Sequence, residues 1–213
     1  SDRSMIVQMS RARAYLGMQC FWGESAFAKQ KGVVGTRVGY AGGTTPAPTY
    51  RNIGDHTEVT EVTFDPSIIT YRSVLDFFWS HHDPTLHNKK QYQSAILWTN
   101  EEEEKIAKET YEEQKNKLGK LDTYVVALDK FHQAEDYHQK YWLRAQTRIV
   151  KELNMTDETI ATSEIAAKAN AYMAGYTDFT DLDRLAKELN LSADLVRVIR
   201  EIAERGGDPR ACH

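Results

Sequence analysis

Apolar residues in the first two-thirds of the chain follow a two-residue period in some segments and a helical period in others. Segments rich in Val, Ile, Thr and Tyr predict strands over residues 14–17, 33–40, 59–64, 94–98 and 124–128. Helical spacing predicts helices over residues 24–31, 71–82 and 101–118. Thr70 can cap the second helix, and Gly119 can end the third. The predicted order is therefore β-α-β-β-α-β-α-β.

A Gly- and Pro-containing loop joins the strands over residues 33–40 and 59–64. Parallel neighbours need a long crossover, usually a helix, so we expect these two strands to be antiparallel. This predicts an α+β fold, in which helices pack on a mixed, largely antiparallel sheet. The arrangement is close to the split βαβ pattern.

The pattern changes after about residue 150, where strand signals disappear. Apolar residues at helical spacing predict three helices, around 165–173, 182–189 and 195–202. Ser192 can cap the last of these. We therefore divide the chain into an α+β domain over residues 1–150 and a helical extension over residues 151–213, ending in a mobile C-terminal tail.

Composition excludes several classes of protein. The 213 residues carry a net charge of -4 and are 41% hydrophobic, which is typical of a globular chain. The sequence has no basic stripe of the kind that binds nucleic acid, and no apolar run approaches the roughly 18 residues that span a membrane. The first ten residues have no signal-peptide pattern, so we expect the reducing environment of the cytoplasm.

The chain has two cysteines, Cys20 and Cys212, too few for a disulfide framework or a four-cysteine zinc site. Cys20 lies where a predicted strand meets a predicted helix. The free amides and dipole at the start of a helix favour a thiolate. Phe21 and Trp22 follow directly, so the segment fits a reactive thiol in an apolar pocket. A buried cysteine among core aromatics fits equally well.

Several motifs together resemble the A-type methionine sulfoxide reductases, the peptide-methionine (S)-S-oxide reductases. They occur in the family's order between residues 14 and 142. The segments are Gly17-Met18-Gln19-Cys20-Phe21-Trp22-Gly23, Val38-Gly39-Tyr40-Ala41-Gly42-Gly43, Pro48-Thr49-Tyr50-Arg51, His56-Thr57-Glu58-Val59, Phe78-Trp79 with His82-Asp83-Pro84, Gln91-Tyr92-Gln93-Ser94-Ala95-Ile96 and Ala134-Glu135-Asp136-Tyr137-His138-Gln139. The resemblance implies that residues 1–150 form the catalytic domain.

The resemblance implies that Cys20 attacks the sulfur of methionine-S-sulfoxide and becomes a sulfenic acid. The proton donors to the oxygen would be Glu58, Tyr50 and Tyr92. Strand alternation gives Glu58 the same face as Val62, so we expect it to point inward, where burial raises its pKa. A solvent-exposed glutamate at the end of a strand is the alternative.

Phe21 and Trp22 would enclose the substrate methyl group, a geometry that selects the S epimer at sulfur. Cys212 is the only internal thiol that could resolve a sulfenic acid on Cys20. The alternative is an external thiol, with Cys212 merely a surface residue. We expect thioredoxin, glutathione or glutaredoxin as the reductant, a monomeric enzyme, and no cofactor.

The sequence departs from the family pattern at three places. Gln19 replaces the usual glycine before the cysteine, and His87 stands at the position of an aspartate in the family's polar network. We assign no role to His87. The glycine-rich tail with resolving cysteines is replaced by the helical extension, which leaves the recycling route open.

Other interpretations also fit the sequence. A Cys-His acyl transferase or protease would need a histidine beside Cys20, and seven histidines are available. A non-enzymatic methionine-binding module would use Cys20 as a passive wall. The adjacent His81, His82 and Asp83 fit the end of a helix better than a metal site, because neighbouring helical side chains diverge. We therefore expect no metal.

Overall fold

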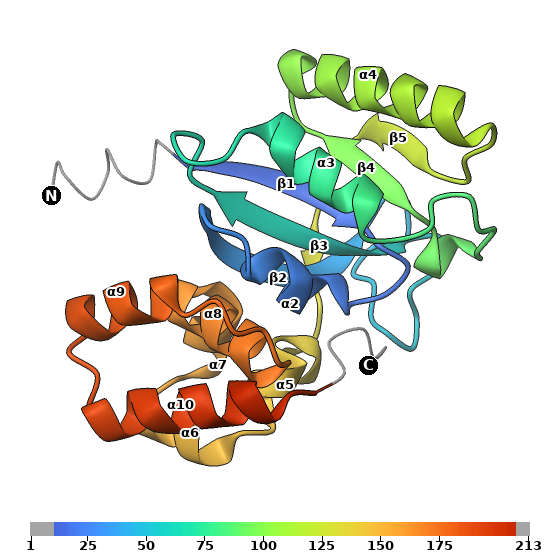
Figure 1. The fold of residues 1–213 in the computed structure, drawn as a ribbon. Helices are drawn as coiled ribbons and strands as arrows, with labels where there is room; N and C mark the ends of the chain where they lie inside the picture. Colours follow the sequence, from blue (N-terminus) through green and yellow to red (C-terminus); the bar gives the residue numbers. More distant parts are fainter. Residues whose placement is uncertain (1–10, 208–213) are drawn as a thin grey trace, which may run out of the picture.

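The computed structural model describes residues 11–207, which contain one mixed sheet (Figure 1). Its order is β5-β4-β1-β3-β2-β6. The strands are β1 (Ala12–Gly17), β2 (Val33–Ala41), β3 (Thr57–Phe64), β4 (Ala95–Trp98), β5 (Tyr124–Ala127) and β6 (His132–Gln133).

The pairing of the strands is largely antiparallel. β3 pairs antiparallel with β1 and β2, β4 pairs antiparallel with β1, and β6 pairs antiparallel with β2. Only the β4–β5 pair among these is parallel. Because β3 lies between β1 and β2, which are connected through a helix, the sheet has the split βαβ arrangement. The predicted α+β fold class is confirmed, including the antiparallel β2–β3 pair.

Helices flank the sheet and form the C-terminal region. They are α2 (Gly23–Ala28), α3 (Tyr71–Ser80), α4 (Glu101–Leu118), α5 (Tyr141–Arg144), α6 (Thr147–Glu152), α7 (Asp157–Thr162), α8 (Glu164–Met173), α9 (Thr180–Glu188) and α10 (Ala193–Arg205). Short 3-10 turns cover Lys90–Tyr92 and Asp136–His138. Helices α5, α6 and α7 were not predicted, because segments of four to six residues carry little periodic signal.

Side-chain caps define several helix ends as predicted. Thr70 accepts a hydrogen bond from the backbone N–H of Ser73, and Ser192 caps α10 in the same way. Asn100 caps α4, which ends at Gly119 with a φ of 85°. These ends need no distant partner, so the sequence predicts them well.

Helix α2 is shorter than predicted and ends at Ala28 rather than at residue 31. Turn hydrogen bonds from the N–H of Gln30 to the carbonyl of Phe27 and from the N–H of Val33 to the carbonyl of Gln30 replace the last helical turn. Gly32 then takes a φ of +94°, a conformation that favours glycine. The chain thereby turns sharply into β2.

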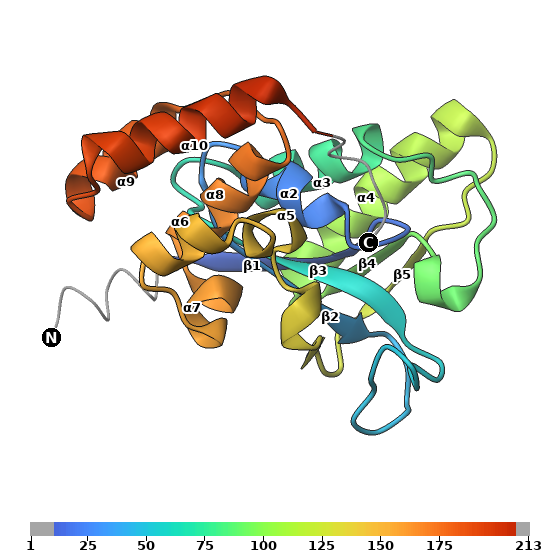
Figure 2. The same ribbon diagram turned by 90° about the horizontal axis from the view of Figure 1, so that it is seen from below.

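Helices α2, α3 and α4 cover one face of the sheet (Figure 2). Alternate strand residues pack against them, including Leu16, Val62 and Ile96. Intervening residues face the other side, where a smaller cluster contains Val59 and Leu97. The larger core also includes Cys20 and Trp22, so the predicted nucleophile belongs to it. Its members are Ala14, Leu16, Met18, Cys20, Trp22, Ala26, Phe27, Val33, Val62, Phe64, Val74, Leu75, Phe77, Phe78, Trp79, Ile96 and Ala107.

The C-terminal helices have a core of their own and also pack on α2. Their cluster draws on α5, α6, α8, α9 and α10, and includes Leu143, Ile149, Tyr172, Leu182 and Ile199. Another face of α8 contacts α2 through small buried alanines, Ala28, Ala167 and Ala171. In the described part of the chain, no helix is long and apolar enough to cross a membrane. The division at residue 150 stays a prediction, and the tail predicted to be mobile lies beyond residue 207.

Lys168 of α8 connects the helical region to α2. Its side chain is only 2% exposed, and its ammonium group lies 3.0 Å from a carboxylate oxygen of Asp181. The Nζ also donates to the backbone carbonyls of Ala28 and Gln30, both at 2.9 Å. Burying an ammonium group is costly unless it is paired and hydrogen-bonded, and this one has three acceptors.

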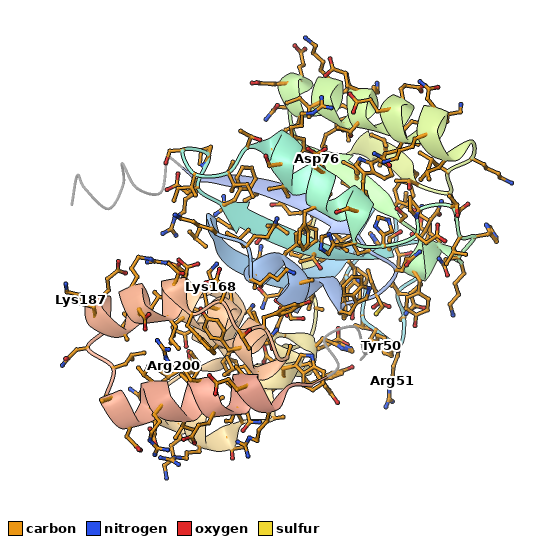
Figure 3. All side chains as sticks on the ribbon, viewed as in Figure 1. Tyr50, Arg51, Asp76, Lys168, Lys187 and Arg200 are labelled. Atoms are coloured by element: carbon orange, nitrogen blue, oxygen red, sulfur yellow. The ribbon has the colours of Figure 1, made fainter. Side chains whose placement is uncertain are left out.

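We predict that Lys168→Met lowers the free energy of unfolding by about 3 kcal/mol, because it leaves a carboxylate and two carbonyls without their shared donor. Urea denaturation measures the change. Lys187→Met is the matched control, since Lys187 lies on the exposed side of α9, and both lysines are labelled in Figure 3. Equal midpoints for the two variants would contradict this account of the α2–α8 contact.

Candidate active site

Three strand ends meet where the predicted site lies. Leu16 pairs with Thr60 and Gly17 pairs with Ala95, so the end of β1 adjoins the starts of β3 and β4. A side chain on Gly17 would lie 2.8 Å from the carbonyl oxygen of Gln93 and would clash. Glycine at this position therefore allows the three chains to approach, which brings the cysteine loop, Glu58 and the 91–93 segment to one edge.

Cys20 lies in the short loop between β1 and α2 and is 5% exposed. It belongs to the same buried cluster as Trp22, and half-buried Tyr92 packs against that cluster. Trp22 precedes α2 as its N-cap residue, and its indole N–H donates to the carbonyl of Met18 at 3.0 Å. This hydrogen bond closes the loop around Cys20 and fixes the orientation of the indole ring.

Gln19, which replaces the family's usual glycine, has a φ of 72°. This left-handed conformation costs a non-glycine residue about 1 kcal/mol. Its side-chain amide donates to the carbonyl of Asp83 at 2.8 Å, and a hydrogen bond of this kind contributes about 1 kcal/mol. The two effects are of similar size, so glutamine is tolerated here, and it ties the cysteine loop to the segment after α3.

Phe21 and Trp22 point into different clusters. Phe21 is fully buried and packs with Tyr40 and His138, with ring centroids 6.1 and 5.3 Å apart. Trp22 instead shares the cluster that contains Cys20. The two aromatic residues therefore belong to different buried clusters, and of the two it is Trp22 that shares the cluster of Cys20.

Glu58 on β3 is buried, at 2% exposure, so its predicted inward orientation is confirmed. Its carboxylate accepts a hydrogen bond from the side-chain amide of Gln91 at 2.7 Å. Burial raises the pKa of Glu58 to about 7, although the hydrogen bond from Gln91 and the charge of Lys89 oppose the shift. A carboxyl with this pKa holds a proton in much of the population near neutral pH.

Tyr50 and Tyr92 come from separate segments and hydrogen-bond to each other through their side chains. Tyr92 ends the Lys90–Tyr92 turn, whereas Tyr50 lies on the loop between β2 and β3 and is 39% exposed (Figure 3). Burial raises the pKa of Tyr92 to about 12, and the bond to Tyr50 and the charge of Glu58 add to the shift. The structure thus brings together the three side chains named as proton donors.

Sequence reasoning gave no role to Gln91, Glu135 or His138, which also contact these residues. Gln91 bonds Glu58, Glu135 accepts from the backbone of Tyr50, and the His138 ring packs on Tyr50. All three lie inside the quoted motifs. Their positions in those motifs were the available signal, but their partners depend on the tertiary fold.

Two histidines that the sequence analysis considered, His87 and His82, have ordinary hydrogen-bonding surroundings. His87 has a 90% exposed side chain, with Nδ1 3.2 Å from a carboxylate oxygen of Asp122. His82 lies at the end of α3 with its nitrogens near the carbonyl of Phe78 and the hydroxyl of Ser94, and burial lowers its pKa to about 4. Among residues 11–207, no group of three His, Cys, Asp or Glu side chains could hold a metal ion. Cys212 lies outside the described residues.

Comparison with known proteins identifies the family of the chain. The family model for peptide methionine sulfoxide reductases matches residues 12–170. A peptide methionine sulfoxide reductase of Drosophila melanogaster is 39% identical over 191 residues, covering 87% of this chain and 78% of that protein. The MsrA of Sulfolobus acidocaldarius is 44% identical over 141 residues, covering 61% of this chain and 80% of that protein.

Solved structures show the same fold. Methionine sulfoxide reductase A of Corynebacterium diphtheriae superimposes with a TM-score of 0.61 at 34% identity, covering 64% of this chain and 76% of that chain. Mxr1 of Saccharomyces cerevisiae in its reduced form gives a TM-score of 0.60 at 28% identity, covering 65% and 87%. The chain belongs to the peptide methionine sulfoxide reductase family, whose members are oxidoreductases.

The raised pKa of Glu58 predicts a pH-dependent stability. The folded state binds this proton more tightly than the unfolded state, whose pKa is near 4.5, so the stabilisation is complete below pH 4.5 and is lost as pH rises through about 7. We expect wild type to lose on the order of 3 kcal/mol relative to Glu58→Gln across this range.

Urea denaturation at pH 5 and pH 8 measures this difference. Exposed Glu112 supplies the control, because Glu112→Gln should follow wild type at both pH values. A pH dependence in Glu58→Gln equal to that of wild type would show that the buried carboxyl does not titrate as described.

Proposed function

We propose that this chain reduces methionine-S-sulfoxide, free or in proteins, to methionine, with Cys20 as the nucleophile. The observation that carries the proposal is the proximity of Tyr50, Tyr92 and the high-pKa Glu58, next to the cluster that holds Cys20: Tyr92 hydrogen-bonds Tyr50 and lies within the electrostatic reach of Glu58. These residues place a cysteine sulfur and three proton-bearing groups at one edge of the sheet. Membership of the peptide methionine sulfoxide reductase family supports the same reaction.

The first step transfers oxygen from the substrate sulfur to the Cys20 sulfur. The Cys20 thiolate attacks the sulfoxide sulfur while the oxygen gains protons, and the products are methionine and a Cys20 sulfenic acid. Oxygen is a poor leaving group until it is protonated, so the step needs general-acid catalysis. One atom of oxygen moves, the substrate sulfur is reduced, and the cysteine sulfur is oxidised.

Glu58 is the general acid in this scheme. Its pKa of about 7 leaves protonated carboxyl available near neutral pH, and Gln91 holds the group through an uncharged amide. Tyr50 and Tyr92 donate hydrogen bonds to the oxygen as it becomes negative. Three donors on the oxygen stabilise the charge that develops in the transition state.

The aromatic residues set the orientation of the substrate. Trp22, fixed by its bond to Met18, contacts the methyl group from the side of Cys20, and Phe21 closes the other side. A tetrahedral sulfur with oxygen on the donors and methyl on the rings fits in one configuration. We therefore assign the S epimer as the substrate.

A second thiol then condenses with the sulfenic acid, releasing water and forming a disulfide that an external dithiol reduces. We propose Cys212 as this resolving thiol and thioredoxin as the reductant, with glutathione or glutaredoxin as the alternative route. The proposal includes a monomeric enzyme of the cytoplasm that uses no cofactor. Residues 1–150 would form the catalytic domain and residues 151–213 its helical extension.

The first test supplies dithiothreitol and each sulfoxide epimer of an N-blocked methionine. We expect wild type to consume the S epimer, Cys20→Ser to be inactive, and Glu58→Gln to keep part of the activity because the amide still donates. Loss of a general acid lowers kcat by about 100-fold or more. Consumption of neither epimer would refute the reductase function, and preference for the R epimer would refute the proposed geometry.

The resolving step is tested with Cys212→Ser. This variant should match wild type with dithiothreitol, which reduces the sulfenic acid directly, but lose turnover with thioredoxin. NADPH oxidation in a coupled thioredoxin assay gives the rate. Equal thioredoxin-dependent rates for variant and wild type would show that an external thiol resolves the intermediate.

A further inference from the structure

The carboxylate of Glu135 connects three tyrosines beside the proposed active site. It accepts hydrogen bonds from the Tyr40 hydroxyl at 2.8 Å, the Tyr50 backbone N–H at 3.1 Å and the Tyr137 hydroxyl at 3.2 Å. We propose that Glu135 is a positioning residue that sets the place of the Tyr50 hydroxyl, with the ring of His138 as the second support. This inference rests on the proposed function, in which Tyr50 donates to the substrate oxygen.

Tyr50 needs an external support because its own segment provides little. The residues between β2 and β3 form a long loop without a helix or strand. A side chain on an exposed loop samples several rotamers, and each misplacement of a catalytic donor lowers the rate. The hydrogen bond from the Tyr50 backbone N–H to Glu135 fixes the backbone from which the side chain extends. Packing against the ring of His138 fixes the orientation of the Tyr50 ring.

Glu135 is itself firmly held, because its segment is tied to β2. The side chain of Gln139 accepts from the N–H of Val38 at 3.0 Å and donates to the carbonyls of Val38 and Ala134 at 2.9 and 3.0 Å. The N–H of Ala134 also donates to the carbonyl of Val38 at 3.0 Å. The strand that carries Tyr40 therefore fixes both the segment and one oxygen of Glu135.

Glu135 is suited to this task as a charged acceptor. Burial works to raise its pKa, but hydrogen bonds from the backbone and from the side chains of Tyr40 and Tyr137 outweigh burial and lower the pKa. An ionised carboxylate accepts stronger hydrogen bonds than a neutral group. The carboxylate therefore holds its donors across the neutral range.

The ring of His138 packs against the rings of both Tyr50 and Phe21. Its ring centroid lies 4.7 Å from that of Tyr50 and 5.3 Å from that of Phe21, and the residue is buried. One imidazole thus contacts both a proposed proton donor and a proposed methyl contact. The 134–139 segment thereby sets the separation between the two parts of the site that must recognise the oxygen and the methyl group.

A double-mutant cycle tests the inference. Glu135→Gln, Tyr50→Phe and the double variant are assayed with dithiothreitol and N-blocked methionine-S-sulfoxide. The amide has one acceptor instead of two, so Glu135→Gln cannot hold both Tyr40 and Tyr50 as the carboxylate does. We expect a fall in kcat on the order of 10-fold to 100-fold in the wild-type background. In the Tyr50→Phe background, the same change should cost less than about 2-fold, because coupled residues are not additive.

Two control variants separate positioning from general stability. Tyr137→Phe removes one donor to Glu135 but keeps the bonds of Glu135 to Tyr40 and Tyr50, so it should lower kcat less than Glu135→Gln does. Glu164→Gln alters another half-buried, hydrogen-bonded glutamate in the helical region and should keep kcat within about 2-fold. Thermal unfolding checks that each variant is folded at the assay temperature.

The outcomes distinguish this inference from the proposed function. Suppose that Tyr50→Phe lowers kcat and that Glu135→Gln lowers it by the same factor in the Tyr50→Phe background as in wild type. That result would overturn the positioning role alone. Unchanged kcat in Glu135→Gln beside an impaired Tyr50→Phe would do the same. Full activity in Tyr50→Phe would overturn both the donor role of Tyr50 and the inference built on it.

Discussion

The register of β3 against β1 is the constraint on which the site depends. Because Leu16 lies opposite Thr60, Glu58 extends past the last residue of β1, where the chain enters the cysteine loop. The pairing of Gly17 with Ala95 brings Tyr92 to the same edge. A register shift of one residue would turn Glu58 to the opposite face of the sheet and separate the carboxyl from the buried cluster around Cys20.

Glu24 and Glu58 show how surroundings give two buried carboxyls different tasks. Glu24 lies in the first turn of α2, and its carboxylate lies 2.8 Å from the ammonium group of Lys140. Both side chains are buried. This ion pair ties α2 to the chain that follows β6. Glu58 instead accepts from the uncharged amide of Gln91, and burial raises its pKa.

The sequence was sufficient for the elements whose determinants are local. The caps at Thr70 and Ser192, the Gly119 stop and strand alternation around Glu58 depend on near neighbours. The motifs also identified which side chains to expect in the site. The hydrogen bonds of Gln91 and Glu135 could not be predicted, because they join segments 33 and 85 residues apart. Likewise, the contact of Gln19 with Asp83 depends on where the end of α3 lies.

The contact between α8 and α2 bears on how this chain can be shortened. Lys168 donates to carbonyls at and just beyond the last turn of the helix that follows the cysteine loop, and alanines from both helices fill the interface. A fragment cut after residue 150 would expose those alanines and leave the two carbonyls to solvent. In such a fragment the apolar side of α2 would be exposed to solvent. The fragment would therefore be a poor substitute for a natural reductase that lacks the extension.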